Sequence, residues 1–261
     1  MSSFHILRYV KVEERKMEKL IIGVSLEAIF ELESLHRTRD FTEKEGSLFA
    51  KGPLFNFMKL LNQINTQQSE FLIEIVIVSD HSPILSTALF HALDYYQLDI
   101  SQVILTGLSD ISSYLEALEV ELYFSTLPHL IHMAQRCKIL AGYIMLNQKN
   151  DCYRFAFDHR LFADEGGYSS LGKWIPLLGF IQRIYQSVQV GMITTRCYSL
   201  ESWVKELFKM AQCRMDEMCF VVHGGGAEVA KLFDFSIYFE GAPREVLSIA
   251  SPSQCLLNID F

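Results

Sequence analysis

The chain has 261 residues, half of them apolar, and a formal net charge of −8 at pH 7. This acidic balance, without any basic stripe, argues against a nucleic-acid partner. The strongest apolar run, residues 71–78, is too short to span a membrane, and the amino terminus lacks the apolar core of a signal peptide, so we expect a cytoplasmic protein.

The first half of the chain alternates apolar strands with amphipathic helices. Strands are expected at residues 20–24, 71–78, 103–105 and 122–124. Helices are expected from Pro53 onward and along an apolar stripe from Leu85 to Leu93. Residues 36–51 are polar and are interpreted as an inserted loop or lid. A segment at 127–146, with Pro128 near a helix start, joins this half to the next. The alternation is typical of a parallel α/β sheet.

The second half repeats this alternation, and polar residues follow its strands. The strand at 153–157 ends at Asp158, and the one at 190–193 is followed by Thr194, Thr195 and Arg196. The strand at 220–222 leads to Gly224, Gly225 and Gly226, which open a helix reaching residue 233, and the strand at 237–239 is followed by Glu240.

The two halves share short sequence features in the same order. Pro-Leu-x-x-Phe occurs at Pro53 and again at Pro176, and Tyr-Phe closes the strand set at Tyr123 and again at Tyr238. We therefore predict an internal duplication with one half at 1–146 and the other, which carries the candidate site, at 147–261. The alternative is that any two α/β halves look alike at this level.

Right-handed crossovers place the strand ends of one half on a single rim. There Asp158 would attack phosphorus, and Thr194 would donate a hydrogen bond to a phosphate oxygen. The glycine-rich helix start would favour an anion, and Glu240 with Asp158 would hold Mg²⁺ through oxygen. Plainer interpretations stay open: Asp158 as a strand-end acid paired with Arg160 or Arg196, and the glycines as a tight turn.

Several segments resemble the cytosolic type-I 5′-nucleotidases of the haloacid-dehalogenase-like superfamily. They include GVSLEAIFELE, GPLFNFMKLL, IVIVSD, TGLSDISSYLEALEVELYFS, RFAFD…LFADE, MITTR and IYFEG, and they span about residues 20–250. The resemblance implies a haloacid-dehalogenase-like fold and Mg²⁺-dependent hydrolysis of nucleoside 5′-monophosphates through an aspartyl-phosphate on Asp158. It also leads us to expect a homo-oligomer.

The chain departs from that family at three motif positions. The family's D-x-D motif has its second Asp, the general acid and base, where this chain has Arg160, which stays protonated near neutral pH. The glycine loop, HGGGAEV, lacks the family's phosphate-binding lysine. The closing Asp-Asp pair appears as Glu240-Gly241, although Asp164 or Glu165 would supply an acid if the shortened loop folded differently.

Two functional hypotheses follow. In the first, the protein is a Mg²⁺-dependent 5′-nucleotidase with Asp158 as its nucleophile. In the second, it is a degraded nucleotidase that binds a nucleotide or a protein without turnover, with Arg160 holding an anion. Arg196 has two interpretations, a phosphate or base contact and a surface charge. In the first half, Asp80 and Asp110 are interpreted as helix caps.

Overall fold

The computed structural model describes residues 18–32, 49–67, 71–145, 152–162, 169–185, 188–194, 202–221, 226–232 and 234–241. Its strands are β1 (Glu18–Val24), β2 (Phe30–Glu31), β3 (Ala50–Lys51), β4 (Phe71–Ser79), β5 (Gln102–Leu105), β6 (Leu122–Ser125), β7 (Leu140–Ile144), β8 (Tyr153–Asp158), β9 (Val188–Thr194), β10 (Glu217–Phe220) and β11 (Ile237–Phe239).

The helices lie between these strands. They are α1 (Leu26–Ile29), α3 (Phe55–Gln67), α4 (Ser86–Tyr96), α5 (Ser112–Ala117), α6 (Pro128–Arg136), α7 (Leu171–Ile184), α8 (Ser202–Met210) and α9 (Gly226–Leu232), with single 3-10 turns at Pro83–Leu85 and His159–Phe162. No helix among the described ranges is long and apolar enough to cross a membrane.

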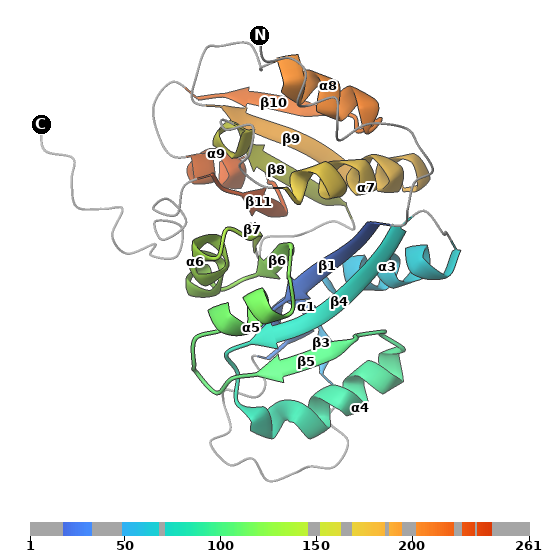
Figure 1. The fold of residues 1–261 in the computed structure, drawn as a ribbon, viewed down its shortest axis with the longest axis vertical. Coiled ribbons are helices and arrows are strands. Elements are labelled where there is room, and N and C mark those ends of the chain that lie inside the picture. Colours follow the sequence, from blue (N-terminus) through green and yellow to red (C-terminus); the bar gives the residue numbers. More distant parts are fainter. Residues whose placement is uncertain are drawn as a thin grey trace, which may run out of the picture.

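One sheet runs through the whole described part of the chain (Figure 1). Nine strands lie in the order β10-β9-β8-β11-β7-β6-β1-β4-β5, so both halves contribute to a single sheet. Neighbouring strands are parallel except β11 and β7, which pair antiparallel at the junction. The predicted α/β class with a parallel sheet is therefore confirmed, and this one junction reverses the strand direction between the halves.

The two halves have the same strand order. In the first half β6 lies beside β1, followed by β4 and β5, and in the second half β11 lies beside β8, followed by β9 and β10. The first half contains one further strand of this sheet, β7, which lies on the other side of β6 and has no counterpart in the second half. A duplication would produce the shared order, but so would two independent α/β units, and the duplication and its domain boundary at residues 146–147 stay predictions.

The segment predicted to join the halves contains an unexpected strand. Helix α6 ends at Arg136, Lys138 then adopts a left-handed backbone with φ of 59°, and β7 follows. Strand β7 fills the centre of the sheet between β6 and β11. Its apolar run is compatible with either a helix or a strand, and tertiary pairing decides between them.

Two smaller differences concern the sheet edges. The strand predicted at 220–222 is β10, which begins at Glu217 and pairs with β9, and Val222 lies outside the described residues. Part of the predicted inserted loop forms β3, which pairs with β2 in a separate two-stranded sheet.

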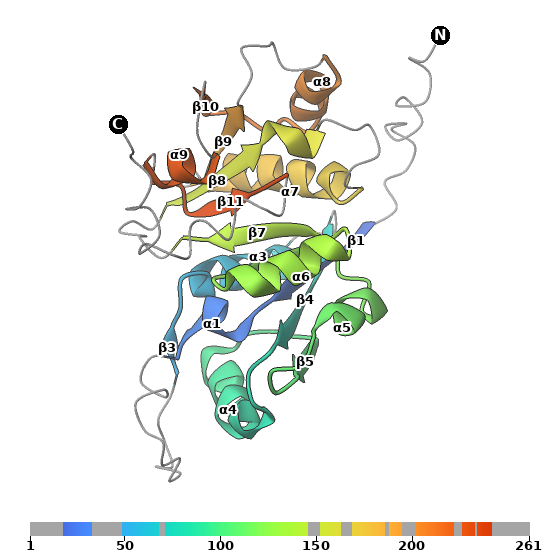
Figure 2. The same ribbon diagram turned by 90° about the vertical axis from the view of Figure 1, so that its left-hand side faces the viewer.

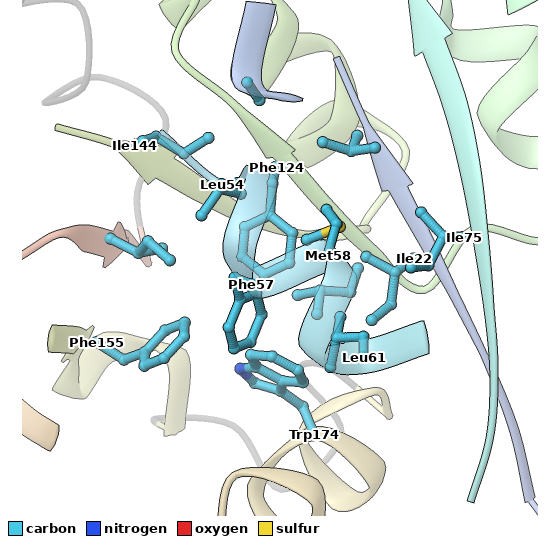
Figure 3. Packing of buried hydrophobic residues seen from close by; sticks show 14 of the residues in the cluster. Ile22, Leu54, Phe57, Met58, Leu61, Ile75, Phe124, Ile144, Phe155 and Trp174 are labelled. Atoms are coloured by element: carbon cyan, nitrogen blue, oxygen red, sulfur yellow. The ribbon is translucent and has the colours of Figure 1, made fainter. Parts of the chain in front are cut away.

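The core lies on both faces of the large sheet. On one face, a single cluster joins residues of α3, α4, α7 and α8 across both halves. At its centre the Phe57 ring lies 6.3 Å from Trp174, whose ring is 5.8 Å from each of Phe124 and Phe155 (Figure 3). The other face is covered by α5 and α6 in the first half and by α9 in the second. Alternate residues of each strand point to opposite faces, so strands buried on both sides read as continuous apolar runs.

Candidate functional site

The carboxyl ends of β8, β9 and β11 meet at one edge of the sheet. Asp158 is the last residue of β8, Thr194 the last of β9, and Glu240 directly follows β11. Phe157 pairs with Phe239 in the parallel register, which places Asp158 level with Glu240. The structure therefore brings these three predicted residues together, and all three are buried.

The Asp158 carboxylate is surrounded by hydrogen-bond donors. Its Oδ1 accepts from the Arg160 backbone N–H at 2.8 Å and from Arg160 Nε at 2.9 Å. Its Oδ2 accepts from the Arg160 guanidinium through Nε at 3.0 Å and through Nη2, and from the Tyr238 hydroxyl at 3.0 Å. Both oxygens are thus engaged, and the side chain is only 1% exposed. An ionised carboxylate offers about four lone-pair sites, and these contacts occupy them.

Glu240 is the second carboxylate of this edge. Its Oε1 lies 4.0 Å from Arg160 Nη2, and its side chain is 1% exposed. Its backbone carbonyl accepts from Gln135 Nε2, on α6, at 3.3 Å. Arg160 therefore faces both acids of the edge, and the plainer interpretation of Asp158 as an acid paired with Arg160 describes the observed contact.

Tyr238 belongs to this site, although the sequence interpretation did not include it. It lies in β11 two residues before Glu240, so its side chain leaves the sheet on the same face. Burial, followed by the nearby Asp158 and Glu240 carboxylates, raises the pKa of its hydroxyl well above the usual value. The phenol therefore keeps its proton and donates a hydrogen bond to Asp158. Side chains two residues apart in a strand share a face, so counting two residues back from Glu240 would have predicted Tyr238 as a site residue.

His159 and Gly241 complete the surroundings. His159 Nδ1 lies 3.4 Å from Asp158 Oδ1, which is within ion-pairing distance when the ring is protonated. Gly241 packs directly on the Arg160 backbone: a Cβ atom at Gly241 would stand 2.6 Å from Arg160 Cβ and 2.9 Å from its carbonyl carbon. Real Cβ contacts are not this close, so the approach requires glycine.

Other predicted site residues lie outside the described part of the chain. They are Thr195, Arg196, Gly224 and Gly225, together with the substitute acids Asp164 and Glu165. Gly226 is the first residue of α9, a helix of seven residues.

The strand ends of the first half form a second cluster, at the opposite edge of the sheet. Ser25 follows β1, Ser79 ends β4 and Ser125 ends β6, and all three are buried. The Glu27 carboxylate accepts from the hydroxyls of Ser25 and Ser125, the latter at 2.8 Å. Ser79 Oγ accepts from the Leu26 N–H at 3.2 Å. This cluster has no aspartate at the end of its first strand.

Asp80 and Asp110, interpreted as helix caps, behave differently. The Asp110 carboxylate accepts from the Ser112 N–H at 2.7 Å, at the start of α5, and these bonds lower its pKa. Asp80 is not the cap of the helical turn that follows it, because Ser82 accepts from Ile84 N there. Asp80 bonds instead to His129 Nε2, on α6, at 2.8 Å. The capping interpretation of Asp80 was therefore wrong, because its partner is remote in sequence.

The residues of the second-half edge do not fit the Mg²⁺ ion that the resemblance implies. A metal ion bound by Asp158 and Glu240 needs lone pairs directed at it, and those of Asp158 point at Arg160 and Tyr238. The Arg160 guanidinium already faces both carboxylates. Within the described ranges, no three carboxylate, imidazole or thiol groups are placed to hold a metal ion.

A shallow hollow lies away from both clusters. It has a volume of about 270 Å³ and is lined by Tyr153, Tyr185 and four residues of α3, namely Asn56, Lys59, Leu60 and Gln63. Tyr153 begins β8, whereas Asp158 ends it. The two residues are five positions apart in this strand. Five steps of a strand span roughly 16 Å, so the hollow is not part of the Asp158 site.

Comparisons with known proteins point to one family. A family model described as 5′-nucleotidase matches residues 12–168, more than half of the chain. The matched range includes Asp158 and Arg160 and ends before Thr194 and Glu240. Among solved structures, MnaA of S. aureus in complex with UDP is 10% identical with a TM-score of 0.27, over 83% of this chain and 72% of that chain. A putative UDP-N-acetylglucosamine 2-epimerase from Listeria monocytogenes is 8% identical with a TM-score of 0.28, over 82% and 71%. Likeness at this level does not identify a function.

Proposed function

Because the chain belongs to the 5′-nucleotidase family, we propose that it binds nucleoside 5′-monophosphates at the edge formed by β8, β9 and β11 and does not turn them over at an enzymatic rate. One observation carries the second part of this proposal, the engagement of both Asp158 oxygens by Arg160. A carboxylate attacks phosphorus through a lone pair, so the nucleophile of this site is blocked in its resting arrangement.

The general acid supports the same proposal. Arg160 stands two residues after Asp158, where the D-x-D motif needs a carboxylic acid, and a guanidinium cannot exchange a proton near neutral pH. Loss of a general acid costs about 10²- to 10⁴-fold in rate. Slow hydrolysis is therefore expected even when Asp158 is released from Arg160.

Charge indicates which groups would hold the phosphate. The two acids Asp158 and Glu240 face the single guanidinium of Arg160, so these three residues alone offer a phosphate dianion no excess of positive charge. Arg196 follows Thr194 by two residues in the sequence. We assign phosphate binding to Arg196 together with Thr194, with the exposed 28% of the Arg160 side chain facing the ligand.

Calorimetry tests binding. The protein is titrated with a panel of nucleoside 5′-monophosphates in the presence of EDTA, and the matching nucleosides without phosphate serve as controls. We expect saturable binding of at least one monophosphate and at least tenfold weaker binding by the Arg196→Met variant. Equal binding of the nucleoside and its monophosphate would remove the phosphate site from the proposal.

Phosphate release tests turnover. Wild-type protein and the Asp158→Asn variant are assayed side by side with the same monophosphates and Mg²⁺. We expect equal, background release from both. Release that is present in wild type and vanishes in Asp158→Asn would establish the alternative, an active nucleotidase with a rearranged acid. Release gained in Arg160→Asp, and lost again with Asp158→Asn, would support a site degraded chiefly at Arg160.

A further inference from the structure

We propose that the guanidinium of Arg160 is the resident cation of this edge and replaces a divalent metal ion between Asp158 and Glu240. The proposal concerns the same site as the proposed function, but it makes a separate statement: the positive charge that holds the two acids together is part of the chain. Three observations lead to it.

The first observation is the burial of the two acids. The side chains of Asp158 and Glu240 are each 1% exposed, and they lie level on adjacent strands. Two buried carboxylates at one strand edge repel each other and lose their hydration, so a nearby cation is needed to keep both ionised. Among the described residues, Arg160 is the one arginine or lysine that contacts either of them.

The second observation is the geometry of the contact. Arg160 presents Nε and Nη2 to the two oxygens of Asp158, and the same Nη2 lies 4.0 Å from Glu240 Oε1. The planar guanidinium matches a carboxylate in this two-point arrangement. Its charge therefore stands where an ion bridging the two acids would stand. A metal ion could enter only if the arginine left.

The third observation is the close approach of Gly241 to the backbone at Arg160. Any Cβ at Gly241 would press on Arg160 Cβ at 2.6 Å and on the Leu161 backbone nitrogen at 2.9 Å. The chain that follows Glu240 can approach Arg160 only because Gly241 has no side chain. The atoms met are Arg160 Cβ and backbone, which any residue but glycine would also place there, so an acid at position 241, the second of the closing pair, is incompatible with this backbone.

Manganese binding tests the proposal without any nucleotide. Mn²⁺, a spectroscopic substitute for Mg²⁺, is titrated into four proteins and followed by electron paramagnetic resonance: wild type, Asp158→Asn, Arg160→Ala and the double variant. We expect wild type and Asp158→Asn to bind Mn²⁺ equally weakly. Arg160→Ala is expected to bind at least tenfold more tightly, and the double variant should lose that gain.

The wild-type comparison alone can overturn the proposal. Tight Mn²⁺ binding by wild type that is lost in Asp158→Asn would show that a metal ion enters beside Arg160. This comparison needs no variant of Arg160, so the test survives if Arg160→Ala fails to fold. Arg160→Lys adds a matched control, because it keeps the positive charge and is expected to exclude Mn²⁺ as wild type does.

The two proposals fail in different ways. If wild type binds a nucleotide and does not bind Mn²⁺ at this edge, both proposals are supported. Failure to bind any nucleotide would end the proposed function but would not change the Mn²⁺ result. A metal site in wild type would end the resident-cation proposal and would leave nucleotide binding intact.

Discussion

The two strand-end clusters occupy matching positions in the sheet but contain opposite chemistry. In the second half, acids end two of the strands, and Arg160 lies two residues after the first of them. In the first half, serines end the strands, and Glu27 lies two residues after Ser25. In both, the side chain two positions on turns back to bond the strand ends.

This difference shows how one backbone frame can satisfy different side chains. Acids at the strand ends are balanced by a base, and hydroxyls at the strand ends are oriented by an acid. Among the described residues of the second-half edge, the Asp158 carboxylate lies beside a guanidinium, whereas in the first-half cluster the Ser79 hydroxyl lies 2.9 Å from His81 Nδ1. The same place in the fold therefore predicts where polar residues gather, but not which reaction they perform.

The largest expected effect is a difference in stability between variants of Arg160 and of Glu27, the two side chains that bond back to the strand ends. Arg160→Met leaves two buried carboxylates without their cation, and we expect it to lower the free energy of unfolding by about 3 kcal/mol. Glu27→Gln keeps an acceptor for the serine hydroxyls, and we expect a loss of about 1 kcal/mol. Urea unfolding of the two variants beside wild type measures both values.

A double variant serves as the control for this comparison. Asp158→Asn removes one of the two charges that Arg160 balances, so adding it to Arg160→Met is expected to recover part of the lost stability. Strictly additive losses would mean that Asp158 and Arg160 are not coupled, and the ion pair would then be incidental to stability.

A second, intermediate effect compares the two tyrosines that precede the closing phenylalanines. The Tyr238 hydroxyl donates to the Asp158 carboxylate, whereas the Tyr123 hydroxyl donates to the Val78 carbonyl at 2.7 Å. A hydrogen bond to a charged group is worth more, so Tyr238→Phe is expected to cost about 2 kcal/mol and Tyr123→Phe about 1 kcal/mol. Chemical unfolding of the two variants beside wild type measures both losses in the free energy of unfolding. A larger loss for Tyr123→Phe would contradict a hydrogen bond from Tyr238 to a charged Asp158.

The last comparison concerns a rate rather than stability, the reactivity of one thiol in each half. Burial raises the pKa of the Cys213 thiol to about 12, and it also raises the pKa of Cys137, which is half-buried. The thiolate is the reactive form, so Cys213 is expected to react about 10³-fold more slowly than a thiol with the ordinary pKa of 9.0. Alkylation at pH 8, read by peptide mass spectrometry, should label Cys137 before Cys213. Prior denaturation in urea should abolish the difference.

Sequence patterns predicted most of the sheet because its strands are apolar runs that end at polar residues. The apolar run at β4 and the apolar stripe that falls in α4 are unambiguous in this respect. Strand β7 escaped prediction because a short apolar run after a helix carries no local signal that separates helix from strand. What places it in the sheet is pairing on both sides, with β6 before it and with β11, about a hundred residues later in the chain.

The candidate site was predictable in position and less so in contacts. Asp158, Thr194 and Glu240 were expected at one rim because parallel strand ends share an edge, and the structure places them there. The Asp158–Arg160 pair was one of two open interpretations. The contact of Gly241 with Arg160 depends on how two chain segments cross, which spacing along the sequence does not encode.

Helix α6 touches both clusters. This helix packs on β6 and β7 near the middle of the sheet (Figure 2). Near its start His129 bonds to Asp80 beside the first cluster, and near its end Gln135 bonds to the Glu240 carbonyl of the second. Six residues of helix separate the two contacts, a span of about 9 Å. Because a helix moves as a stiff rod, a shift of α6 along its axis would alter the two opposite edges of the sheet in a single motion. Helix α6 therefore couples the two clusters mechanically, through His129 at one end and Gln135 at the other.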